Sequence, residues 1–225
     1  MLPAVTSFVN GHATEEPEAC CNIRVGPPTD VQPGDVFIVI LQALENGQRP
    51  TPTAPSGWQP LTFTNLSSTS IVSDEFTSWV FAHVYSSSDP ATYPFSVANL
   101  GGGEFETYFV SYRNASQNLN AYTLYGYADM TSTAALPNVP ANMTLLNVFQ
   151  AVQTEVNEDD LVPVTFSIPA GTPTLTVETP RSVVFPYLAA DVPTGTGGTF
   201  GSYSTNDNYG DEGTTFQVLV PSLTH

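Results

Sequence analysis

Positive charge is nearly missing from this 225-residue sequence, which has four arginines, no lysine and 21 acidic residues. The resulting net charge is −17 at pH 7. Proteins that bind nucleic acids or anionic membranes do so through clusters of lysine and arginine, and the sequence has no such cluster. We therefore expect no nucleic-acid partner and no membrane partner, and we attribute the acidity to solubility and to repulsion of nonspecific partners.

Targeting signals and long apolar runs are also missing. Met1-Leu2-Pro3 opens without a basic segment, and no stretch approaches the ~18 apolar residues of a membrane span. We expect synthesis in a cytoplasm without passage through a secretory route. The three Asn-x-Ser/Thr sequences, at Asn65, Asn114 and Asn142, are then interpreted as accidental.

Cysteine is scarce, and its arrangement argues against a disulfide bond. The two cysteines, Cys20 and Cys21, are adjacent, so on a strand they would point to opposite faces. Two reduced thiols are favoured over a metal or redox role, because no Cys-x-x-Cys spacing and no nearby histidine pattern is present.

The usual signatures of catalysis are absent as well. No Gly-x-Ser-x-Gly elbow occurs, and His83 lies in an aromatic strand, where a packed histidine is favoured over a catalytic one. Glu104 and Glu106 would share a strand face, as glycosidase carboxylates can, but such pairs arise by chance in an acidic chain. The remaining candidates are His12, His225, the acidic pairs at 74–75 and 158–160, and the oxygen-rich loop 206–213, whose spacing does not match a Ca²⁺ loop. We predict no enzyme activity, no cofactor and no bound metal.

The residues that are abundant favour strands. Twenty prolines and sixteen glycines separate short runs rich in Val, Thr, Tyr and Phe, which is the all-β pattern. Residues 35–44 are continuously apolar at their centre, as in a strand buried on both faces. Residues 78–87 alternate, and 142–156 is interpreted as a strand despite partial helical spacing. Further strands are expected at 106–114, 120–129, 162–168, 174–179, 181–189 and 214–221.

Aromatic side chains are the remaining candidates for contacts. Trp58 follows a Pro55-Ser56-Gly57 turn and is predicted to anchor the core rather than to stack on a sugar, and Trp79 likewise. Tyrosine is enriched at interfaces, although a half-buried sheet face is the alternative explanation. The candidate partner-contact residues are Tyr108, Tyr112, Tyr122, Tyr125 and Tyr127.

Four short motifs occur in a recognisable order. They are VQPGDVFIVILQAL (31–44), APSGWQPL (54–61), WVFAHVYSSSDPATYPFSV (79–97) and YFVSYRNAS (108–116). This order resembles the jelly-roll-like β-sandwich modules of bacteriophage virion proteins, in which a PAGW-type turn, a YYRVATASDPASYTF-like stretch and an AYRG-like strand recur. The chain departs from the pattern at Asn114, where the family more often has glycine.

The resemblance implies an all-β, antiparallel two-sheet β-sandwich of jelly-roll type on the virion surface. Residues 31–225 would form one β-sandwich domain, and residues 1–30 an N-terminal arm and first strand that anchor it. The expected function is a non-enzymatic capsid decoration, or cement, protein on the capsid exterior, with the major capsid protein as partner and a homotrimer as assembly.

Two other roles stay open at this point. The chain could be a carbohydrate- or receptor-binding module of a tail or head fibre, with exposed aromatic side chains near 99–104 and 193–213 and host-surface glycans as ligands. It could also be a component of a tail tube or baseplate.

Overall fold

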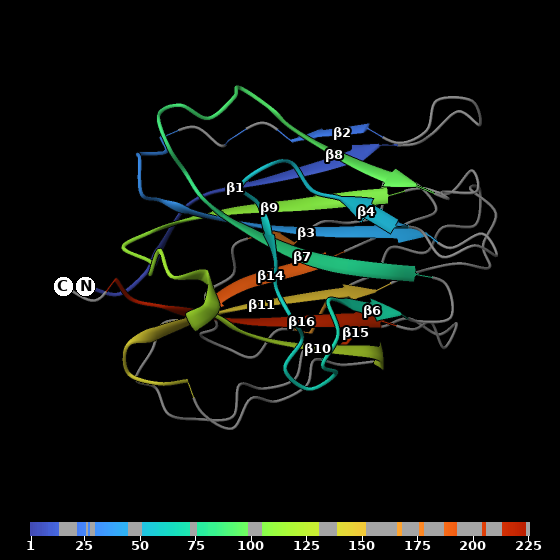
Figure 1. Cartoon of the computed structure of the whole chain (residues 1–225). Helices are drawn as coiled ribbons and strands as arrows, with labels where there is room; N and C mark the ends of the chain where they lie inside the picture. Colours follow the sequence, from blue (N-terminus) through green and yellow to red (C-terminus); the bar gives the residue numbers. More distant parts are fainter. Residues whose placement is uncertain are drawn as a thin grey trace.

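The computed structural model of the chain is built almost entirely from antiparallel strands (Figure 1). It describes residues 1–13, 22–25, 27, 30–44, 51–72, 76–98, 105–130, 139–151, 166–167, 176–177, 187–192, 204–205 and 213–223. Besides strands, these residues include one short 3-10 turn, η1 (Leu119–Ala121). The predicted all-β, antiparallel fold is confirmed, whereas the jelly-roll topology stays a prediction.

A six-stranded central sheet forms the middle of the molecule. Its strands follow the order β1 (Ala4–Ala13), β9 (Phe105–Arg113), β3 (Val36–Leu44), β7 (Phe76–Val84) and β5 (Gln59–Pro60), and β6 (Ser70–Val72) also pairs with β7. Both neighbours of β3 pair with it along nearly its whole length. This explains its sequence, because a strand in the middle of a covered sheet has no face that meets water.

Two further sheets accompany the central one. The five-stranded sheet has the order β10 (Thr123–Met130), β16 (Gly213–Pro221), β11 (Met143–Ala151), β14 (Tyr187–Val192) and β13 (Thr176–Val177). The three-stranded sheet has the order β2 (Asn22–Val25), β8 (Tyr93–Ala98) and β4 (Thr51–Thr53). A separate pair consists of β12 (Phe166–Ser167) and β15 (Ser204–Thr205).

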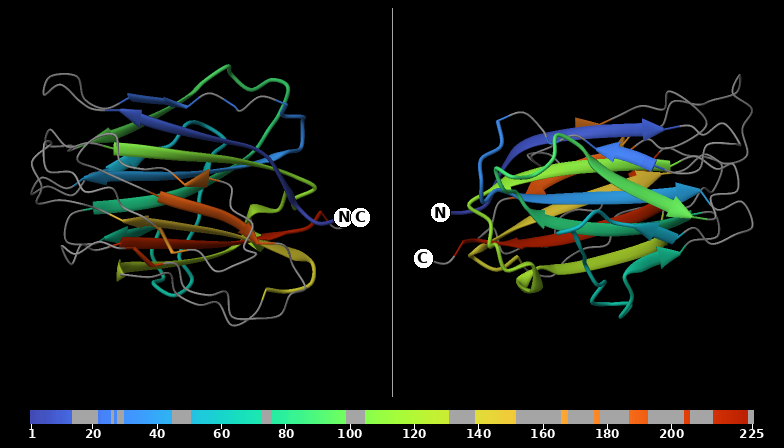
Figure 2. Two further views of the ribbon diagram at one scale, coloured as in Figure 1. Left: turned by 180° about the vertical axis from the view of Figure 1, so that it is seen from behind. Right: turned by 45° about the horizontal axis from the view of Figure 1, so that its top comes forward.

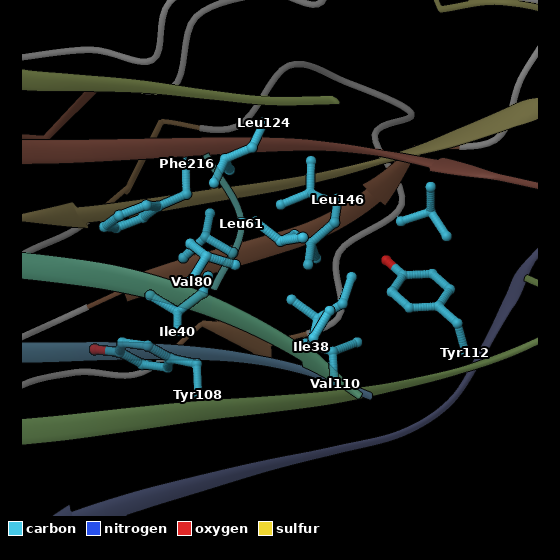
Figure 3. Packing of buried hydrophobic residues seen from close by; sticks show 14 of the residues in the cluster. Ile38, Ile40, Leu61, Val80, Tyr108, Val110, Tyr112, Leu124, Leu146 and Phe216 are labelled. Atoms are coloured by element: carbon cyan, nitrogen blue, oxygen red, sulfur yellow. The ribbon is translucent and has the colours of Figure 1, made fainter. Parts of the chain in front are cut away.

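The central sheet separates two hydrophobic cores. Ile38 and Ile40 of β3 face the five-stranded sheet, where Phe216 and Leu146 meet them (Figure 3). We call this the first core. Phe37, Val39 and Leu41 point the other way and pack with Tyr93, Phe95 and Val97 of the three-stranded sheet, and we call this the second core. The expected two-sheet sandwich is therefore corrected to three packed layers.

The predicted alternation of residues 78–87 is confirmed by this division. Val80 and Ala82 are in the first core, whereas Trp79 and Phe81 are in the second. The ambiguous segment 142–156 contains β11, so the strand interpretation is confirmed for Met143–Ala151.

The first strand that was expected within residues 1–30 is present, and the anchoring role of that segment stays a prediction. Residues Ala4–Ala13 form β1, which pairs with β9 from Ala4↔Arg113 to Ala13↔Phe105, and β2 pairs with β8. The Oγ1 of Thr144 also donates a hydrogen bond of 3.1 Å to the carbonyl oxygen of Pro3. These residues belong to the sandwich rather than preceding it.

Both ends of the described chain meet at one end of the sandwich (Figures 1 and 2). The Leu223 amide donates to the Asn114 carbonyl at 2.8 Å, and the Asn114 side chain contacts the sulfur of Met1 at 3.1 Å. Asn114 itself has a φ of 60°, a conformation that favours glycine or asparagine. This explains how asparagine is accommodated where the resembling family more often has glycine. We call this the terminal end, and β3 begins there.

Candidate functional site

The Trp58 side chain lies inside the second core at the terminal end. Gly57 has a φ of 87°, and the turn is closed by a 3.2 Å hydrogen bond from the Trp58 amide to the Pro55 carbonyl. The indole is 7% exposed and packs edge-on against Tyr93 and Phe95, with ring centroids 5.0 and 5.1 Å away. The prediction that Trp58 anchors the core is confirmed, and Trp79, 6% exposed, is buried as well.

His83 is held from both sides of its ring. Nδ1 lies 2.9 Å from the Gly57 carbonyl oxygen, and Nε2 lies 2.6 Å from Oδ2 of Asp89. The imidazole also stacks on Trp58 at 5.1 Å and 20°. Both ring nitrogens therefore lie within hydrogen-bond distance of oxygen atoms that accept hydrogen bonds.

Asp89 is the carboxylate that faces Nε2 of His83. Its Oδ2 accepts hydrogen bonds from the Ser86 amide at 3.1 Å and from the Tyr93 hydroxyl at 2.8 Å, besides that from His83. Burial raises the pKa of Asp89, but these hydrogen bonds, that of His83 first, outweigh burial, so the pKa lies below its ordinary value. The carboxylate is thus ionised at neutral pH.

This histidine cluster, consisting of Gly57, Trp58, His83, Asp89 and Tyr93, has no geometry for acid–base catalysis. A general base needs a nitrogen that is free to take a proton from substrate, and both nitrogens of His83 are engaged. Burial, and then the neighbouring Asp89 carboxylate, raise the pKa of Tyr93, so the phenol stays protonated at neutral pH. The cluster instead fixes the turn before Trp58 and the loop 85–92 to strand β7.

A second polar pair fixes the start of β3. Arg113 donates from Nε to Oδ1 of Asp35 at 3.2 Å and from Nη2 to Oδ2 at 3.1 Å, a bidentate arrangement. The Gln32 amide donates to the same carboxylate at 2.8 Å, and Nη2 also reaches the Asp30 carbonyl at 2.7 Å. Hydrogen bonding to Asp35 raises the pKa of Arg113. The Asp35 side chain is 4% exposed, so this ion pair neutralises a buried charge.

These contacts bring together the four motifs of the sequence, which span residues 31–116. The Asp35–Arg113 pair joins the first to the last, and His83 joins the tryptophan turn to the Ser86–Asp89 loop. Reciprocal backbone hydrogen bonds of 2.8 Å, from Gly34 to Tyr85 and from Tyr85 to Asp35, join the first to the third. Sequence reasoning missed the roles of Asp35, Asp89 and Arg113. For the two aspartates, the local signal is a spacing of three residues. The carboxylate accepts a hydrogen bond from the backbone amide three residues earlier, from Gln32 to Asp35 and from Ser86 to Asp89.

The tyrosines proposed for partner contact are divided by the fold. Tyr108 and Tyr112 have no exposed surface and lie in the first core (Figure 3), so their assignment as partner-contact residues is wrong. Tyr122 packs partly against the same core and donates to the Ser116 carbonyl at 2.9 Å, and burial raises its pKa. Tyr125 and Tyr127 are half-buried, and Tyr125 packs beside Leu145 and Leu219 on the other face of the five-stranded sheet.

One of the sequon asparagines is used inside the fold. The Asn65 amide donates to the Gly126 carbonyl at 2.6 Å, and its Oδ1 accepts from the Gly126 amide at 3.1 Å. These two hydrogen bonds join Asn65 to strand β10.

Several sequence candidates lie outside the described residues or have side chains that are not described. The first group comprises Cys20, Cys21, Glu104, His225 and residues 74–75, 158–160 and 206–212. His12 and Glu106 are in strands and are register partners, and only their backbone is described. Among the described residues, no group of three His, Cys, Asp or Glu is placed to hold a metal ion, and no helix is long and apolar enough to cross a membrane.

The comparisons with known proteins give no family for the chain. No family model matches it, and neither the curated proteins nor the solved structures contain a match.

We expect replacement of Arg113 by methionine to lower the urea midpoint of unfolding, because it leaves the buried Asp35 carboxylate without its cation. The change should be much smaller in an Asp35→Asn background, where no buried charge is left unpaired. Urea denaturation of the four proteins in this double-mutant cycle is the measurement. Equal midpoint shifts in both backgrounds would show that the ion pair contributes nothing.

Both tryptophans should be shielded from solvent. Because Trp58 and Trp79 are 7% and 6% exposed, we expect emission shifted to the blue and weak quenching by iodide in the folded protein, with strong quenching in urea. Adding sugars should leave the spectrum unchanged. A spectrum that shifts with a sugar would show that a tryptophan lies close to a ligand.

Proposed function

We propose that the chain is a non-enzymatic structural protein on the outer surface of a bacteriophage capsid, acting as a decoration, or cement, protein. It would bind the major capsid protein, bridge neighbouring subunits as a homotrimer and add buried interface area that resists internal pressure. Synthesis in the host cytoplasm and assembly onto the capsid exterior belong to the same proposal.

One observation carries the proposal most directly. The four motifs that resemble phage virion modules contact one another at the terminal end through Asp35–Arg113, His83–Asp89 and the Gly34–Tyr85 backbone hydrogen bonds. Motif residues that are distant in sequence but joined in space are what a shared structural framework requires. This supports a relation to those modules rather than a chance similarity of short segments.

The use of the polar residues also supports a structural role. In the described part of the chain, the Asp35–Arg113 and His83–Asp89 pairs hold turns and strands together. Chemistry on a substrate would require at least one of these groups to be free. The acidic, lysine-free composition agrees with a protein that must avoid DNA while it assembles on a capsid.

The carbohydrate- or receptor-binding role is the alternative that the same framework permits. Its expected aromatic contacts near 99–104 and 193–213 lie outside the described residues, apart from residues 204–205 and 213. The burial of Trp58 and Trp79 removes the two indoles that could have stacked on a sugar. We therefore rank this role second.

Immunogold labelling of intact virions with an antibody against this chain tests the proposal. We expect gold distributed over the head, and none on virions from which the gene has been deleted. Labelling confined to the tail tip would overturn the decoration role and favour receptor binding. Absence of the chain from purified virions would overturn both. A second measurement, the melting temperature of heads with and without the chain, should show a higher value with it.

A further inference from the structure

Gln42 is a buried polar side chain whose amide has no hydrogen-bond partner among the described residues. It follows the apolar run Val36–Leu41 on the most enclosed strand of the central sheet, and it is 0% exposed. Neither Nε2 nor Oε1 has a hydrogen-bond partner in the described part of the chain. Native proteins pair nearly all buried polar side-chain atoms with protein or with ordered water, and no described protein group is paired with this amide.

The residues beside Gln42 on the central sheet are also polar. Its register partners are Ser78 on β7 and Glu106 on β9, and the partner of Glu106 on β1 is His12. Directly opposed residues of antiparallel strands lie on the same face of a sheet. Because Ile38 and Ile40 face the first core, period-two alternation places Gln42 on that face as well. Ser78 is 1% exposed, so it is covered as Gln42 is.

On the five-stranded sheet, the residues that face the first core also change from apolar to polar along strand β16. Phe216 of β16 packs in the first core close to Ile40 and Tyr108 (Figure 3). Thr214 is two residues earlier on the same face of β16, is 2% exposed, and has Gln150 as its register partner. In Figure 3 the phenol of Tyr108 points away from Tyr112, in the direction in which β3 continues to Gln42. The first core therefore ends, opposite the terminal end, in polar groups on both sheets.

We propose that this end of the first core is an internal water site, in which ordered water hydrogen-bonds to the Gln42 amide. Water can donate to Oε1 and accept from Nε2, so one kind of molecule satisfies both atoms. The hydroxyls of Ser78 and Thr214 supply further partners, as a buried water requires about three hydrogen bonds.

This inference goes beyond the proposed function and does not depend on it. Proteins hold roughly one buried water per 27 residues, or about eight in a chain of this length. A test must therefore detect a difference between variants rather than a total.

Oxygen-17 and deuterium relaxation dispersion of water count the long-lived internal waters. We expect Gln42→Met, which conserves side-chain length and removes the amide, to lose at least one such water relative to the wild type. Gln32→Met is the matched control, because Gln32 is exposed, and its count should equal that of the wild type. An unchanged count in Gln42→Met would overturn the proposal.

A second variant protects the test against misfolding. Thr214→Val keeps the side-chain shape and removes the hydroxyl, and it should also reduce the count or shorten the water residence time. If Gln42→Met does not fold, the Thr214→Val result decides, and wild-type behaviour there would overturn the proposal. A high-resolution crystal structure should place ordered water within hydrogen-bond distance of Gln42 Nε2 or Oε1, and its absence would contradict the assignment.

Discussion

Replacing Asp89 by alanine is expected to lower the free energy of unfolding by about 3 kcal/mol at neutral pH. The change removes the acceptor of three hydrogen bonds, those from His83, Ser86 and Tyr93. It also leaves Nε2 of His83, whose side chain is 10% exposed, without its hydrogen-bond partner. Asp89→Asn keeps an acceptor oxygen but no charge, so its loss should be smaller. Urea denaturation, with the exposed Ser88→Ala variant as the control, is the measurement.

The effect of Asp89 should depend on pH with a definite sign. Its pKa in the folded protein lies below the ordinary value of 3.8, so the ionised form is bound more strongly in the folded state. The stabilisation is therefore fully present above about pH 3.8 and is lost as the pH falls through the folded pKa. The difference between wild type and Asp89→Ala should shrink over that interval. A difference that stays constant down to pH 2 would show that charge plays no part in it.

The second large effect is expected at Gly126, where alanine should cost about 2 kcal/mol through overpacking. An added Cβ would overlap Cδ1 of Ile71 and would lie 2.5 Å from Cδ1 of Phe63, a rigid ring in the first core. The backbone cannot easily move away, because the two hydrogen bonds to Asn65 hold both the amide and the carbonyl of Gly126. The strand would have to shift or the ring would have to leave its place.

A double-mutant cycle separates overpacking from loss of backbone freedom. Ile71→Val removes the atom that overlaps most, so Gly126→Ala should cost clearly less in that background than in the wild type. Guanidinium denaturation of the four proteins measures both values. Equal costs in the two backgrounds would contradict steric overlap as the cause.

Much of the central sheet could be predicted from the sequence because its strands are long and their burial follows simple rules. The apolar centre of 35–44 corresponds to β3, which is buried on both faces. The alternation after Trp79 corresponds to β7, which divides its side chains between two cores. The turn chemistry of Gly57 was sufficient to place Trp58 inside. In each case, burial of the side chains follows from the hydrophobic pattern of the segment itself.

The third layer could not be predicted in the same way. The strand β4 has three residues and β2 has four, too few to establish a period.

The edge strand β1 of the central sheet was also hard to predict. It contains Ser7, Asn10 and Gly11, which resemble a loop in composition but are tolerated at the edge of a sheet. Its composition therefore predicts an arm and a first strand within residues 1–30. Nothing in the segment indicates that its partner is β9, which is distant in the sequence.

The polar contacts of the candidate site were hidden for a related reason. Asp35 and Arg113 are 78 residues apart, and nothing local indicates that they meet. Tyr108 and Tyr112 were proposed for the surface because tyrosine is common at interfaces, but the sheet that carries them is covered on both faces. Burial of that kind depends on the number of layers, which the pattern of a single strand does not report.

The position of β3 has a consequence for how the protein opens. Its strand is the common wall of both cores, with Ile38 and Ile40 on one side and Phe37 and Val39 on the other. Detaching either covering sheet exposes one set of these side chains, and detaching β3 exposes both. The amide protons of β3 should therefore exchange with solvent only through global unfolding, whereas those of the short strand β4 can exchange through local opening. Because β3 contributes side chains to both cores, a substitution that destabilises one core should also lower the stability of the other.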